Sequence, residues 1–139
     1  MARIMAIDYG AKRTGVAVTD PLQLIANGLT TVNTEQLFSF LKEYFTKEPV
    51  EKLIVGNPKN LDNSDTDVTL LVQKFVETFT KRFPSIMVEL VDERYTSKLA
   101  FQSMLESGMK KKDRRNKKLV DEISATILLQ QYLDKMSHL

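Results

Sequence analysis

The sequence contains no cysteine and a single histidine, His138, so the residues of two common kinds of site are missing. Without cysteine the chain forms no disulfide and has no thiolate nucleophile, which is compatible with a reducing compartment. Zinc sites are built mainly from cysteine and histidine, so zinc chemistry is not expected. If the chain binds a metal, its ligands are expected to be oxygen atoms.

Long hydrophobic runs are also missing. No apolar stretch of the sequence approaches the roughly 18 residues that a membrane-spanning helix needs, and residues 1–4 lead directly into a strand pattern with no signal-peptide core. We therefore expect a cytoplasmic protein with no membrane partner. The length of 139 residues, with 42% hydrophobic and 27% charged residues, is typical of one globular domain. No repeat, low-complexity tract or linker interrupts the sequence, so residues 1–139 are expected to form a single domain.

Positive charge is concentrated in residues 110–118, although the net charge of the whole chain is only +2. This basic segment has seven basic residues and one acid, which gives it a net charge of +6 and leaves −4 on the remainder of the chain. Its basic residues are Lys110, Lys111, Lys112, Arg114, Arg115, Lys117 and Lys118. Such a cluster attracts polyanions, of which nucleic acid is the commonest in cytoplasm. Charged segments also occur in loops that serve only solubility.

Apolar runs predict five β-strands, at residues 3–7, 16–18, 29–32, 52–56 and 86–91. The first three runs follow one another with only turn-like residues between them, which predicts an antiparallel meander. Its first turn is expected to be a seven-residue hairpin tip, from Tyr9 to Gly15, bracketed by glycines.

Helical spacing of apolar residues predicts four helices between and after these strands. The first begins at Thr34, an N-cap candidate, and ends before Pro49; the second runs from Ser64 to before Pro84. The third begins at Thr96 or Ser97 and ends at Gly108, and the last spans Leu119 to Met136. The chain is therefore expected to have an α/β fold, with a mixed five-stranded sheet, antiparallel in its first three strands, flanked by helices.

Acidic residues at three distant positions, Asp8, the pair Asp92 and Glu93, and Asp121, follow apolar runs or lie on a helix with small neighbours. A buried carboxylate is costly unless something positive neutralises it, and a divalent cation is a usual solution. Side chains alternate along a strand, so only one of Asp92 and Glu93 shares a face with Asp8; we favour Glu93, with Asp92 as the alternative. Because the ligands are hard oxygens, the pattern predicts Mg²⁺ or Mn²⁺.

Four blocks of sequence give the chain its resemblance to a known family: residues 7–17 (IDYGAKRTGVA), 55–58 (VGNP), 92–97 (DERYTS) and 120–125 (VDEISA). With these blocks in order along nearly the whole chain, the sequence resembles the YqgF family. These are small bacterial RNase H-like proteins proposed as Holliday junction resolvases and as nucleases that mature the end of precursor 16S ribosomal RNA. The chain departs from the family at Asn63 after Asp62, where glycine is usual, and at Ser124, where alanine is usual. Neither change removes a proposed ligand.

The resemblance implies an RNase H-like fold and a metal-dependent phosphodiesterase, either endonuclease or exonuclease. It implies that Asp8, Glu93 and Asp121 are both the catalytic and the metal-binding residues, holding two metals about 3.5 to 4 Å apart. It also assigns nucleic-acid contact to the basic segment and to the hairpin tip, where Lys12 and Arg13 lie. Arg94 is a further candidate for phosphate contact, or it pairs with Asp92.

Three functions remain open. The first is processing of the 5′ end of precursor 16S ribosomal RNA in ribosome biogenesis, with ribosomal precursor particles as partners. The second is resolution of branched DNA at Holliday junctions, which favours a homodimer over a monomer because the junction is two-fold symmetric. The third is RNA binding without catalysis, as an assembly factor. No short motif here announces contacts to the 2′-hydroxyl, so RNA and DNA are not separated. ATP hydrolysis of the actin and sugar-kinase kind is not expected, because it needs two such domains and a chain much longer than 139 residues.

Overall fold

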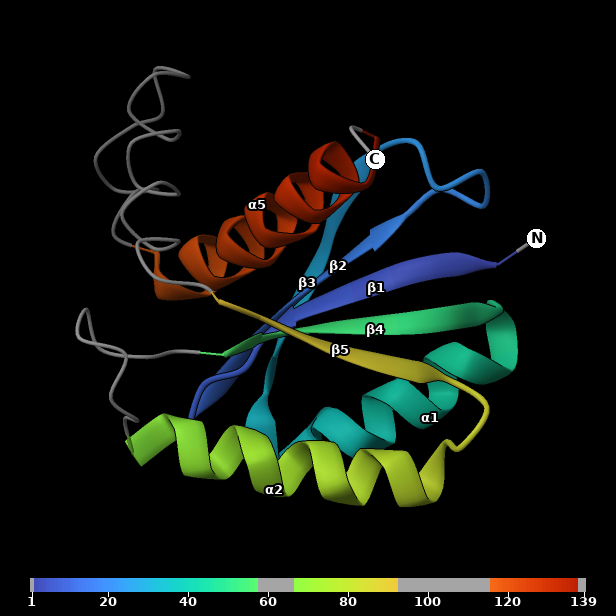
Figure 1. Cartoon of the computed structure of the whole chain (residues 1–139). Helices are drawn as coiled ribbons and strands as arrows, with labels where there is room; N and C mark the ends of the chain where they lie inside the picture. The colour runs from blue at the N-terminus through green and yellow to red at the C-terminus, as the bar shows by residue number, and fades with distance from the viewer. Residues whose placement is uncertain (1, 58–66, 93–115, 138–139) are drawn as a thin grey trace.

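The computed structural model describes residues 2–57, 67–92 and 116–137, and these form a five-stranded sheet with helices on both faces (Figure 1). The strands are β1 (Arg3–Asp8), β2 (Arg13–Thr19), β3 (Ala26–Asn33), β4 (Val50–Asn57) and β5 (Met87–Asp92). A short 3₁₀ turn, η1 (Thr34–Gln36), leads into α1 (Leu37–Lys47), and the other helices are α2 (Asp67–Arg82) and α5 (Lys117–Ser137). The helix expected between Thr96 and Gly108 lies outside the described residues.

The sheet has the order β3-β2-β1-β4-β5. The pairs β3–β2 and β2–β1 are antiparallel, whereas β1–β4 and β4–β5 are parallel. This confirms the expected mixed five-stranded sheet with three antiparallel strands at the start. Because β1, β4 and β5 run in the same direction, their carboxyl ends lie at the same edge of the sheet, and α5 begins near that edge (Figure 1).

The two faces of the sheet bury two different cores. Helices α1 and α2 cover one face with aromatic and large aliphatic side chains, among them Leu41 and Phe79, which are fully buried. Among the described helices, only α5 covers the other face (Figure 1). The core under it contains Ile4, Ala6, Ala17, Ile54, Ala125, Leu128, Leu129 and Tyr132. Alanines on the strands of this second face let α5 approach the sheet closely.

The hairpin tip is shorter than the predicted seven residues. Strand β2 begins at Arg13, because Arg13 and Thr14 pair with β3 and Gly15 pairs with both β1 and β3, so the tip consists of residues 9–12. The predicted N-cap role of Thr34 is also wrong, since no side-chain cap bond forms at this helix start. The Thr34 hydroxyl instead donates to the carbonyl of Gly10, at 2.6 Å, and so ties the tip to the end of β3.

Helix α5 begins at Lys117 rather than at the expected Leu119 because Asn116 caps it. The Asn116 Oδ1 accepts the backbone N–H groups of Lys118, at 3.1 Å, and of Leu119, at 3.3 Å. These are the donors that a helix start leaves without partners inside the helix. Within the described ranges no helix, α5 included, combines the length and the apolar character needed to cross a bilayer.

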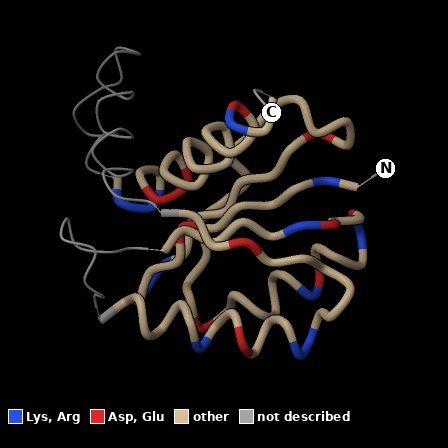
Figure 2. The backbone as a smooth tube through the Cα atoms, in the orientation of Figure 1, with Lys and Arg blue, Asp and Glu red and all other residues tan. Residues whose placement is uncertain are grey.

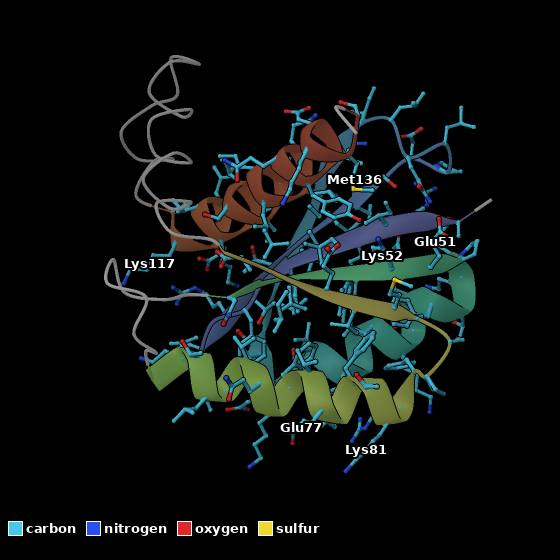
Figure 3. The ribbon with its side chains drawn as sticks, viewed as in Figure 1. Glu51, Lys52, Glu77, Lys81, Lys117 and Met136 are labelled. Carbon is cyan, nitrogen blue, oxygen red and sulfur yellow. The ribbon has the colours of Figure 1, made fainter. Side chains whose placement is uncertain are left out.

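The far end of α5 is fastened to the sheet by a polar cluster. The Lys52 ammonium on β4 donates to the hydroxyl of Tyr132 on α5, at 2.6 Å, and lies 3.8 Å from the Glu89 carboxylate on β5. The hydrogen bond that Lys52 donates to Tyr132 is the main cause that raises the pKa of Lys52. Figure 3 shows Lys52 and Met136 at the end of the molecule opposite Lys117. This cluster therefore anchors the C-terminal part of α5, far from the end of the helix that carries Asp121.

Candidate active site

Asp8 lies at the carboxyl end of β1, on the face of the sheet that α5 covers. Ile4 and Ala6 of the same strand belong to the core beneath α5, and alternation places Asp8 with them. Its partner across the antiparallel pair is Gly15 on β2. Asp8 is partly buried, so its carboxylate stands at the boundary between the core and solvent.

Asp121 reaches the same place from α5, because the helix rests on Gly15. A Cβ atom built on Gly15 would stand 1.9 Å from the carbonyl oxygen of Asp121 and 2.9 Å from the amide nitrogen of Glu122. Only a residue without a side chain allows this approach. Register-paired residues in antiparallel strands lie about 4.5 to 5.5 Å apart, so the Gly15 backbone has Asp8 beside it and Asp121 above it.

Arg13 is the positive partner of Asp121. Its Nε donates to the Asp121 Oδ2 at 3.0 Å, and the two side chains are 30% and 24% exposed. Arg13 occupies the position on β2 that shares a face with Gly15 and Ala17, the face covered by α5. Sequence analysis assigned Arg13 to the hairpin tip; in the structure it belongs to the strand, and it contacts an acid rather than projecting from the turn.

The tip between β1 and β2 is held in place by Thr34. The backbone N–H of Thr34 donates to the carbonyl of Lys12, at 2.9 Å, and its hydroxyl lies 2.9 Å from that of Thr14. Tyr9 packs against Phe75 of α2 with 5.1 Å between the ring centroids, and burial raises the pKa of its phenol. The fixed tip leaves Lys12 exposed beside the acidic positions.

The third acidic position comes from β5, which ends at Asp92. Asp92 pairs in the backbone with Asn57 of β4, and Glu93 lies outside the described residues. Between β1 and β5 stands β4, whose residue on the α5 face at this edge is Gly56. A glycine there leaves no side chain between Asp8 and the end of β5.

Basic residues surround this edge where the structure describes them. Lys117 and Lys118 are exposed in the first turn of α5, which is coloured blue in Figure 2. The hydroxyl of Thr31 on β3 donates to the carbonyl of Lys118, at 2.5 Å, which fixes this turn against the sheet edge. The remaining predicted contacts, Arg94, Lys110, Lys111, Lys112, Arg114 and Arg115, lie outside the described residues.

The donor set suits a hard divalent cation. The backbones at Asp8 and Asp121 meet at Gly15 on the face that α5 covers, both residues are partly exposed, and carboxylate oxygens are ligands that Mg²⁺ and Mn²⁺ prefer. In the described ranges no group of three acidic or histidine side chains forms a complete metal site.

Sequence reasoning missed three contributors to this arrangement. Gly15 is the residue on which α5 packs, Arg13 is the ion-pair partner of Asp121, and Gly56 leaves the strand next to Asp8 without a side chain. The available signal was that glycines occur at only five positions, and of these Gly56 falls inside a predicted strand while Gly15 directly precedes one. Glycine in a strand often marks a close approach of another backbone.

The fold is that of RNase H-like nucleases. In a comparison with solved structures, the chain is similar to "T. thermophilus RuvC in complex with Holliday junction substrate", with a TM-score of 0.56, 14% identity, and coverage of 98% of this chain and 96% of that one. At this identity the likeness concerns the fold, which agrees with the expected RNase H-like architecture.

Residues 2–135 match the family model "RuvX: Holliday junction resolvase", and the chain belongs to this family, the YqgF family that the four sequence blocks indicate. It is 59% identical over 139 residues to a protein of Phocaeicola vulgatus, covering 100% of both chains. It is 60% identical over 134 residues to one of Bacteroides thetaiotaomicron, covering 96% of this chain and 97% of the relative. Both relatives are described as "Putative pre-16S rRNA nuclease". The chain is thus a member of a nuclease family.

Proposed function

We propose that this protein is a metal-dependent nuclease that hydrolyses phosphodiester bonds in precursor 16S ribosomal RNA, processing its 5′ end during ribosome biogenesis. The observation that carries the proposal is the meeting of Asp8 and Asp121 at Gly15, with Arg13 beside them. The substrate is proposed from relatives that are 56% to 60% identical along nearly their whole length and are described as "Putative pre-16S rRNA nuclease".

We assign the binding of Mg²⁺ or Mn²⁺ to Asp8, Asp121 and Glu93. For the third ligand Glu93 is preferred to Asp92 because Glu89 and Val91 face α5, as their contacts with the Lys52 cluster and the α5 core indicate. If the alternation of β5 continued one step beyond its end, residue 93 would be next on that face. When bound, the cations would activate the attacking water and stabilise the charge that develops on the leaving oxygen.

The protein's own groups have three tasks in this proposal. The carboxylates of Asp8 and Asp121 bind the cations. Gly15 on β2 lets α5, which carries Asp121, approach the sheet that carries Asp8. Basic residues around the edge, Lys12, Lys117 and Lys118 among those described, bind backbone phosphates of the RNA and position it. Arg94 and the rest of the basic segment are proposed to extend this phosphate-binding surface.

Metal removal provides the direct test. We expect the purified protein to cleave labelled precursor 16S RNA at its 5′ side with Mg²⁺ or Mn²⁺, to lose all cleavage in EDTA, and to recover it when the metal is restored. The position of the products on a sequencing gel distinguishes an endonuclease from an exonuclease. Cleavage that continues unchanged in EDTA would contradict the metal-dependent mechanism.

A second candidate is resolution of Holliday junctions, favoured by the description of the matching family model. The discriminating experiment offers four-way DNA junctions and precursor RNA to the same protein under the same salt and metal. Symmetric cleavage of the junction, with the RNA untouched, would replace the proposed function. Binding of RNA without cleavage of either substrate would favour an assembly factor.

The basic segment is expected to govern the salt dependence of RNA binding. Changing Lys110, Lys111 and Lys112 to glutamine should lower the slope of log K against log salt by about two to three, because each phosphate contact contributes roughly 0.7 to 0.9. Filter binding at several salt concentrations measures this slope. The control changes Lys42, Lys74 and Lys81, exposed on α1 and α2 across the sheet. Equal slopes in both triple variants would show that the basic segment does not contribute to RNA binding.

A further inference from the structure

Arg13 occupies a carboxylate that the proposed function assigns to a metal. Its Nε lies 3.0 Å from the Asp121 Oδ2, and both side chains are partly exposed, at 30% and 24%. A divalent cation that binds Asp121 through Oδ2 must therefore displace this guanidinium. The contact is either a fixed structural ion pair or one that is exchanged when the metal arrives.

Two features of the local structure favour exchange. The backbone of Arg13 is immobilised, because it pairs with Asn33 on β3 and the adjoining carbonyl of Lys12 accepts the N–H of Thr34. The guanidinium, by contrast, is attached through a flexible side chain with a solvent-facing path. Release from Asp121 therefore requires only rotation of the side chain, and it leaves the positive charge beside the site.

The charges in the site provide the reason for such an arrangement. Asp8 and Asp121 both adjoin Gly15, and two carboxylates held in one place repel each other unless positive charge is near. Arg13 provides that charge on β2 itself. When a cation binds Asp121 and the guanidinium is released, its planar set of N–H donors fits the oxygens of a phosphate.

We propose that Arg13 is a positioning residue that holds Asp121 before metal binds, yields the carboxylate to the cation, and then binds a phosphate of the nucleic acid next to the cleaved bond. This inference rests on the proposed metal-dependent nuclease. It predicts effects of opposite sign on metal affinity and on cleavage, which a fixed structural ion pair does not.

The test measures Mn²⁺ binding to the full chain by calorimetry, without nucleic acid, and cleavage separately. R13Q should bind Mn²⁺ about two- to fivefold more tightly than wild type, because the partly exposed ion pair that competes with the cation is removed. Its cleavage rate should fall at saturating metal. In a D121N background the same substitution should no longer tighten Mn²⁺ binding, since the shared carboxylate is absent.

Two further variants control for charge and folding. R13K keeps the charge but not the planar set of donors, so its Mn²⁺ affinity should stay near that of wild type while its cleavage falls. R3Q removes another strand arginine, whose Nε lies 3.3 Å from the Glu48 carboxylate outside the proposed site, and should change neither property. Unchanged or weaker Mn²⁺ binding by R13Q overturns the inference. Wild type that neither binds Mn²⁺ nor cleaves RNA refutes the proposed nuclease function instead.

Discussion

Asp8→Asn is expected to reduce metal-dependent cleavage at least about 10³-fold, because removing a charged ligand forfeits several kcal/mol of transition-state stabilisation. Asparagine matches aspartate in size but lacks the charge that holds a cation. The residue stands at the end of β1, at the boundary of the core beneath α5, so the substitution should leave the fold intact. The measurement is single-turnover cleavage of precursor 16S RNA, with circular dichroism to verify folding.

The matched control is Asp134→Asn. Asp134 lies on the exposed far part of α5, where its carboxylate accepts a hydrogen bond from Gln130 at 2.9 Å. The two substitutions change the net charge equally, so only their location differs. Full activity in both variants would show that the acidic positions around Gly15 are not the site of cleavage.

Gly15→Ala is expected to disturb stability and activity together. The new methyl group would stand 1.9 Å from the Asp121 carbonyl oxygen and 2.3 Å from its carbon, and these are backbone atoms that move only if α5 moves. Overpacking of this kind lowers the free energy of unfolding by about 1 to 3 kcal/mol, which corresponds to a melting temperature lower by roughly 3 to 12 °C. Cleavage should fall even where the protein remains folded, because Asp121 is displaced from Asp8.

Gly28→Ala supplies the comparison. A Cβ atom on Gly28 also meets α5, but its nearest neighbours are Oε1 and Cγ of the Glu122 side chain, at 2.7 and 3.0 Å. The end of a glutamate side chain can turn aside, so this variant should lose less stability and retain cleavage. Thermal melting and cleavage of both variants test the contrast. Equal behaviour would mean that the contact of α5 with β2 does not set the geometry of the site.

The main elements of the fold are predictable from the sequence because their signals are local. The run around Met5 and Ile7 is buried on both faces, and apolar strands of this kind stand out from the polar segments between them. Pro49 and Pro84 mark where the first two helices have to end, and α1 and α2 do end before them. The boundaries are less predictable, since Arg13 and Thr14 carry no apolar signal and become strand only through pairing with β3.

The site is predictable only in part, because its geometry depends on packing between distant segments. The acids could be chosen as candidates, and Asp8 and Asp121 do lie together, although their binding of metal stays a prediction. The roles of Gly15 and Arg13 in this packing could not be predicted from the sequence. Both look like parts of a turn until α5 is placed across the strand, and nothing within the hairpin indicates where that helix rests.

The contact between Arg13 and Asp121 spans 108 positions in the sequence. Closing so long a segment carries a large entropic cost, and contacts of high sequence separation form late in folding. The strands β1, β2 and β3 are joined by short connections and can associate early, whereas α5 has to find their common face afterwards. We therefore expect the two carboxylates to come together late in folding, and partly folded chains to be unable to cut RNA.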